Sequence, residues 1–142
     1  MVWAVCEDLG VNYADAVVLY QSEFFTGLFP DENQKFGNVE YVPKVNGDRE
    51  ASLLLMRETM LSRNDLTAAV FIGGMEGVLA EYELFTQFNS NATVLAIPSP
   101  GGAAQELAAN LGAANAVDAQ DVDFAKIIYT HLGIEPDEER VV

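Results

Sequence analysis

The stretch LTAAVFIGGMEGVLAE, residues 66–81, decides the fold that this sequence predicts. Residues 66–72 form an almost uninterrupted apolar run of strand length, as expected of a strand that is covered on both faces. Gly73 and Gly74 then allow a tight turn, and the apolar spacing over residues 77–88 predicts a helix. A buried strand, a glycine turn and a helix in this order indicate an α/β fold.

The same alternation of strands and helices extends to both sides of this stretch. Asp48 and Asp121 are the expected N-caps of two further helices, and Gly133 is the expected end of the last one. The alternation predicts a Rossmann-like fold of three layers, with a mostly parallel sheet of about four or five strands. In chain order, the other expected elements are a helix at residues 2–9, strands at 16–20 and 39–42, a helix at 49–62, a strand at 93–97, a helix at 103–111, a strand at 114–117 and a helix at 121–131, with a long loop that holds a helical turn at 24–37.

The composition predicts one acidic domain. Half of the 142 residues are apolar, which is enough for a single buried core, and we assign residues 1–134 to one domain and residues 135–142 to an acidic tail. The 22 acidic and 7 basic residues give a net charge of −15, which disfavours binding to nucleic acid or to an anionic membrane. No apolar run reaches the roughly 20 residues of a membrane span, and the N-terminus lacks the pattern of a secretion signal. We therefore expect a cytoplasmic protein.

Cysteine and histidine are too scarce for several kinds of site. Cys6 and His131 are the only residues of these types and lie far apart in the chain, so a zinc cluster is excluded and a Cys-His or Ser-His catalytic pair is disfavoured. We expect neither a metal ion nor a cofactor.

The glycine turn is the first candidate binding site. Glycines let the backbone approach a ligand closely, and the N-terminus of the helix that follows offers amide groups and a partial positive charge to a phosphate. The alternative interpretation is that glycine serves only the geometry of the turn. The predicted ligand contacts of this turn are Gly73, Gly74, Met75, Glu76 and Gly77.

Two other segments follow strands that are expected to end at the same edge of the sheet, where ligands of α/β proteins collect. Tyr20, Gln21 and Ser22 end the first strand, where Tyr20 could stack on a base and Gln21 could bind its edge; a core tyrosine is the alternative. Ser99, Gly101 and Gly102 precede the alanine-rich helix, and they form either a second anion cradle or a tight turn that the neighbouring prolines stiffen.

Arg57 and Glu81 supply opposite charges near the glycine turn. Arg57 shares a helix face with Met56 and Met60, so it is either a surface ion-pairing residue or a residue that points into a site. Glu81 lies one turn into the next helix, from where its side chain can point back toward the glycines. Together they would offer a cation to a phosphate and a carboxylate to a sugar or base.

These residues resemble the SLOG superfamily, which includes the lonely-guy (LOG) cytokinin-activating phosphoribohydrolases. LOG enzymes carry an arginine on the preceding helix and a Pro-Gly-Gly-x-Gly-Thr-x-x-Glu turn. The resemblance is closer to a SLOG branch seen in bacterial conflict systems, and it covers most of residues 16–107. The matching segments are Leu19-Tyr-Gln-Ser22, Ser52-Leu53, Met56-Arg57, Phe71-Ile-Gly-Gly-Met-Glu-Gly-Val78 and Gly101-Gly-Ala-Ala104.

The chain departs from the LOG pattern in its glycine turn and at its start. Ile72 stands in place of the proline, Val78 replaces the threonine, and the interval from Gly74 to Glu81 is one residue longer. Glu76 or Glu83 is therefore an alternative to Glu81. Members of the branch usually begin with two more strands and another glycine-rich turn, so the resemblance implies a shortened or internally initiated form. Either a second subunit completes its half-pocket, as in the dimers usual for LOG proteins, or catalysis has been lost.

The resemblance implies a nucleotide ligand and leaves three functions open. The first is a binding module that senses or sequesters a nucleotide or an NAD-derived small molecule. The second is a nucleotide N-glycosidase, in which Arg57 anchors the 5'-phosphate and Glu81 assists cleavage between base and ribose. The third is an interaction protein with a vestigial site.

Overall fold

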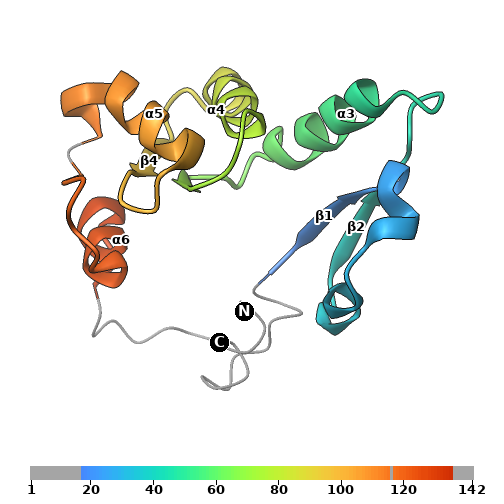
Figure 1. Cartoon of the computed structure of the whole chain (residues 1–142), viewed down its shortest axis with the longest axis horizontal. Helices are drawn as coiled ribbons and strands as arrows, with labels where there is room; N and C mark the ends of the chain where they lie inside the picture. The colour runs from blue at the N-terminus through green and yellow to red at the C-terminus, as the bar shows by residue number, and fades with distance from the viewer. Residues whose placement is uncertain (1–16, 116, 136–142) are drawn as a thin grey trace. The chain divides into compact units, whose positions relative to one another are not determined.

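The computed structural model describes residues 17–115 and 117–135 (Figure 1). The chain divides into two compact units, Met1–Met60 and Leu61–Val142. The helix expected at residues 2–9 and nearly all of the acidic tail lie outside the described residues. The assignment of residues 1–134 to one domain stays a prediction.

The first unit contains a parallel pair of short strands. Strands β1 (Leu19–Ser22) and β2 (Val39–Val42) pair in register from Leu19 with Val39 to Ser22 with Val42. Their connection is built from the 3-10 helices η1 (Glu23–Leu28) and η2 (Asp31–Lys35), which confirms a loop with helical turns in this region. Strand β2 has the predicted bounds, whereas β1 lies slightly later in the chain than predicted.

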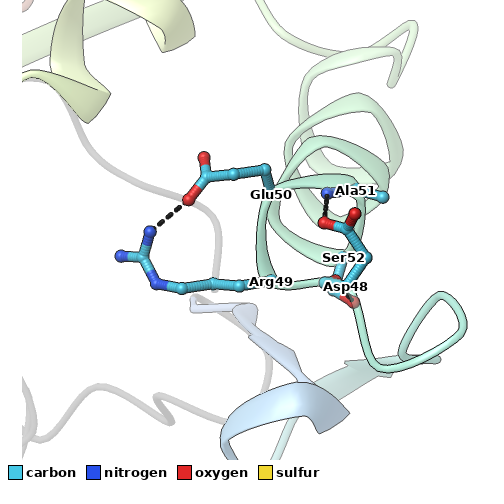
Figure 2. A network of polar contacts seen from close by, with 5 residues as sticks. All are labelled: Asp48, Arg49, Glu50, Ala51 and Ser52. Atoms are coloured by element: carbon cyan, nitrogen blue, oxygen red, sulfur yellow. Dashed lines mark hydrogen bonds and ion pairs between the residues drawn. The ribbon is translucent and has the colours of Figure 1, made fainter.

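The start of helix α3 (Arg49–Leu61) is fixed by a small polar network (Figure 2). Asp48 caps the helix as predicted, because its Oδ1 accepts a hydrogen bond of 2.9 Å from the Ala51 amide. The fully buried Ser52 accepts a 2.9 Å hydrogen bond from the Val45 amide through its Oγ, which also donates to the Asp48 carbonyl. The turn before α3 is therefore tied to the first helical turn by one buried hydroxyl. Arg49 and Glu50 form an exposed ion pair beside it (Figure 2).

The second unit contains a strand, helix and parallel strand in succession. Strand β3 (Ala68–Ile72) leads through helix α4 (Gly77–Phe88) to strand β4 (Thr93–Ile97), and the two strands pair from Ala68 with Thr93 to Ile72 with Ile97. Helix α5 (Gly102–Leu111), the 3-10 helix η3 (Gly112–Ala114) and helix α6 (Phe124–Leu132) follow (Figure 1). Helix α4 and strand β4 have the predicted bounds.

Alternating residues of this strand pair face two different sets of helices. On one face, Phe71 and Ala96 pack with Ala104, Leu107 and Ala108 of α5 and with partly buried residues of α4. On the other face, Leu95 and Ile97 pack with Ile127 of α6. Strands with apolar residues on both faces need this double cover, so the second unit has helices on both sides of its strands, as predicted.

The prediction of a strand at residues 114–117 is wrong for the described residues of this range, Ala114, Asn115 and Val117. Residues 112–114 form η3, and the side chain of Asn115 bonds the edge of β4. Its Oδ1 accepts from the Ala96 amide at 2.8 Å and its Nδ2 donates to the Ala96 carbonyl at 2.7 Å. The described residues contain two parallel pairs of strands, which confirms an α/β chain; one sheet of four or five strands stays a prediction.

The last helix begins later than predicted because a different aspartate caps it. Asp123 Oδ1 accepts from the Lys126 amide at 3.0 Å, which is the N-cap bond of α6. Asp121 instead accepts from the Asp123 amide at 3.0 Å, within the preceding turn. Gly133 ends the helix with φ of +64°, as predicted.

Candidate functional site

Two glycine turns follow neighbouring strands in the second unit. Ile72 and Ile97 are paired as the last residues of β3 and β4, so the segments starting at Gly73 and Pro98 leave the same edge side by side. This is the carboxyl edge at which ligands of parallel α/β proteins collect. The structure therefore brings together two of the three segments that the sequence predicts to bind a ligand.

The turn after β3 needs glycine at both of its first positions. Gly73 and Gly74 have φ of +62° and +80°, which residues with a side chain rarely adopt. At Gly74 there is a second reason, because an added Cβ would lie 2.3 Å from Cγ2 of Val78. The Val78 side chain thus occupies the space beside the turn, at the position where LOG enzymes carry a threonine.

The N-terminus of α5 binds the backbone of this turn directly. The Ala103 amide donates to the Gly74 carbonyl at 3.1 Å, and the Ala104 amide donates to the Gly73 carbonyl at 2.9 Å. The approach is close enough that a Cβ on Gly102 would lie 2.6 Å from the Gly74 oxygen. The two glycine turns are therefore one hydrogen-bonded unit.

These contacts favour the tight-turn interpretation of the segment before α5. Two of the first amides of α5 already donate to carbonyls of the protein, and the Gly101 amide donates to the Pro98 carbonyl at 2.9 Å. The Oγ of Ser99 is buried and has no hydrogen-bond partner among the described residues. Ligand binding by Ser99, Gly101 and Gly102 stays a prediction.

The turn that leads into α4 has backbone amides without a backbone acceptor among the described residues. Glu76 occupies the N-cap position without making a side-chain cap, and the Val78 and Leu79 amides donate to the Met75 and Glu76 carbonyls. In the described part of the chain, no backbone carbonyl accepts from the amides of Gly74, Met75 or Glu76, and these three residues are exposed. Uncapped amides at a helix N-terminus favour an anion, although the Glu76 carboxylate nearby opposes one.

The other predicted residues of α4 and the turn lie around these donors. Gly77 is the first residue of α4, and Glu81 is half-buried in its second turn. Two apolar side chains flank the glycines: Ile72 is 54% exposed and Met75 is 85% exposed. The exposed part of the turn therefore runs from Gly74 to Glu76, with the apolar side chains of Ile72 and Met75 beside it.

The remaining predicted contacts belong to the first unit. Tyr20 and Gln21 are half-buried in β1, and Arg57 is half-buried in α3. Ser22 is buried, and its Oγ accepts a 3.3 Å hydrogen bond from the Phe24 amide, which caps η1. Ser22 thus has a structural role within its unit. Contacts of these four residues with a ligand, and the joint action of Arg57 with the glycine turn, stay predictions.

The comparison with protein families agrees with the strand, glycine turn and helix described above. A model of the SLOG cluster3 family matches residues 1–132. The chain belongs to the SLOG cluster3 family. No curated protein and no solved structure matched it. Membership confirms the predicted relationship to the SLOG superfamily and suggests a nucleotide-related function.

Two features of this SLOG cluster3 chain escaped the sequence analysis. One is the pairing of the Asn115 amide with β4, for which the sequence offers no signal beyond a single asparagine. The other is the contact between the start of α5 and the glycine turn. The run Gly101-Gly102-Ala103-Ala104 could have indicated this contact, since such small residues allow two backbones to approach.

No group of three or more His, Cys, Asp or Glu side chains in residues 17–115 and 117–135 is arranged to hold a metal ion. Over the same residues, no helix has the length and apolar character that crossing a membrane requires.

Proposed function

We propose that this SLOG cluster3 chain binds a nucleotide, or a small molecule derived from one, through a phosphate group at the Gly73-Gly74 turn. The observation that carries the proposal is the exposed turn with positive φ angles, which opens α4 without a side-chain cap. Phosphate oxygens would accept hydrogen bonds from the amides of Gly74, Met75 and Glu76, which have no backbone acceptor among the described residues. The proposed role is that of a module that senses or sequesters its ligand.

The acidic surface is compatible with a phosphate at this turn. The net charge is −15, but charges further away than about 8 Å are largely screened at physiological ionic strength. A hydrogen bond to a charged group contributes about 1.5–3 kcal/mol. Two such bonds from fixed amides therefore outweigh a diffuse and screened repulsion.

Glu81 supports a second candidate, the hydrolysis of the bond between base and ribose. Its carboxylate is half-buried on the helix that the glycine turn opens, within the unit that would hold the phosphate. A carboxylate in such a place could position water or stabilise a positively charged sugar. The homodimer and the lack of nucleic-acid binding stay predictions that accompany both candidates.

Calorimetry on the full chain with adenosine 5'-monophosphate and ADP-ribose tests the proposal. We expect saturable binding, which Gly74→Ala abolishes because its Cβ would overlap Val78. The matched control is Gly112→Ala, since Gly112 also has a positive φ but has no atom within 4 Å of an added Cβ. Circular dichroism establishes that both variants are folded. No heat of binding from folded wild-type protein at millimolar ligand would overturn the proposal.

A further inference from the structure

The direction of the amides in the glycine turn follows from the bonds that its carbonyls make. In a trans peptide the C=O and N–H groups point in opposite directions, and the described residues contain no cis peptide. The Gly73 carbonyl points to the Ala104 amide, so the Gly74 N–H points away from α5. The Gly74 carbonyl points to the Ala103 amide, so the Met75 N–H points away from α5 as well.

The two amides lie on the side of the turn that faces away from α5. The N–H groups of neighbouring residues in a helix run nearly parallel to its axis, and Ala103 and Ala104 are neighbours in the first turn of α5. The Gly73 and Gly74 carbonyls accept from these two amides, so both peptides turn their oxygens toward the start of α5 and their N–H groups to the other side. Successive backbone N–H groups with a common direction form a concave site that binds anions.

We infer that α5 is the positioning element of the proposed phosphate site, with Gly102 as the residue that permits its approach. This inference rests on the proposed function and deepens it. The phosphate does not bind the N-terminus of α5; it binds the Gly74 and Met75 amides. Helix α5 holds these two peptides in place through the hydrogen bonds to their carbonyls on the opposite side of the turn. The positive end of α5 acts through these two peptides, because hydrogen bonds in a chain polarise one another.

Gly102 is the one position in α5 at which this arrangement can be tested by adding a methyl group. Its φ is +69°, and its Cβ would lie 2.6 Å from the Gly74 oxygen and 2.9 Å from the Gly73 carbonyl carbon. These are backbone atoms, so the turn or the helix must shift. Gly112, at the other end of α5, has φ of +54° and open space around an added Cβ. Gly112→Ala therefore reproduces the backbone strain without the overlap.

The test is a ¹⁵N NMR titration of the full chain with adenosine 5'-monophosphate, repeated with inorganic phosphate. In the wild type we expect the Gly74 and Met75 amide signals to move most and to saturate. Hydrogen exchange at the Ala103 and Ala104 amides should slow at saturation, which a purely structural contact would not require. Gly102→Ala should weaken binding about tenfold or more, and Gly112→Ala by less than about twofold.

Other results would contradict either the positioning role of α5 or the proposed binding of phosphate at the glycine turn. If the wild type binds, but the largest shifts lie outside Gly74 and Met75 or exchange at Ala103 and Ala104 is unchanged, the positioning role is wrong and binding stands. The same holds if folded Gly102→Ala binds as the wild type does. If Gly102→Ala does not fold, the wild-type shifts and exchange decide alone. If folded wild type binds neither probe, the proposed function and the inference both fail.

Discussion

The side-chain amide of Asn115 pairs with the backbone of Ala96 as a neighbouring strand would. Asn115 is 3% exposed, and its two hydrogen bonds satisfy both the N–H and the C=O of Ala96, the fourth residue of β4. Buried backbone groups without partners are costly, so this one side chain closes an edge that a further strand would otherwise cover.

Replacing Asn115 with alanine should therefore destabilise the second unit markedly. The change leaves two buried backbone groups of Ala96 without partners, and we expect a loss of about 2–4 kcal/mol in the free energy of unfolding. Urea denaturation followed by circular dichroism measures it. Asn110→Ala, on the exposed side of α5, should change stability by no more than about 0.5 kcal/mol. Equal effects of the two changes would contradict the structural role given to Asn115.

Ser52→Ala should destabilise the first unit. The change removes the acceptor of the Val45 amide and a buried donor to the Asp48 carbonyl, so we expect a loss of about 1–2 kcal/mol. Faster hydrogen exchange at the Val45 and Ala51 amides would localise the effect to the start of α3. The exposed Ser62→Ala is the control. Unchanged exchange at Val45 would show that the hydroxyl does not hold this turn.

Glu81→Gln separates binding from hydrolysis. If the chain is an N-glycosidase, release of free adenine from adenosine 5'-monophosphate should fall by about two orders of magnitude or more, while calorimetric affinity stays within a few-fold. Glu106→Gln, on the exposed side of α5, is the matched control. Wild-type protein that binds the nucleotide without releasing base would leave the binding module as the function.

Met75→Ala should weaken the binding of a nucleotide without weakening the binding of inorganic phosphate. The side chain is 85% exposed beside the proposed phosphate seat, so it is free to contact the ribose or base. We expect affinity for adenosine 5'-monophosphate to fall about two- to fivefold and affinity for inorganic phosphate to stay unchanged, because the Met75 amide remains. Phe88→Ala, at the far end of α4, should change neither affinity. An equal loss for both ligands would mean that the substitution disturbs the turn itself.

The elements with clear apolar periodicity could be predicted well from the sequence. Strand β4 and helix α4 have the expected bounds because their residues are apolar in the pattern that burial requires. The start of α6 was less well determined. Asp121 and Asp123 are both suitable caps, and only the path of the chain decides that Asp123 bonds the Lys126 amide.

The parts that could not be predicted depend on contacts between distant segments. A strand at residues 114–117 fits the local apolar residues, but Asn115 satisfies β4 with its side chain, which no periodicity reveals. The position of the glycine turn at the end of β3 was predicted. The carbonyls that this turn directs toward α5 depend on the approach of Gly102, a tertiary contact that the sequence marks only by small residues.

The Gly73-Gly74 turn is expected to bind a phosphate through its outward-facing amides. The most direct measurement is a crystal structure of the full chain grown with adenosine 5'-monophosphate. We predict a phosphate oxygen within about 3 Å of the Gly74 and Met75 amide nitrogens. A nucleotide bound with its phosphate elsewhere on the chain, while this turn contacts only water, would contradict the claim.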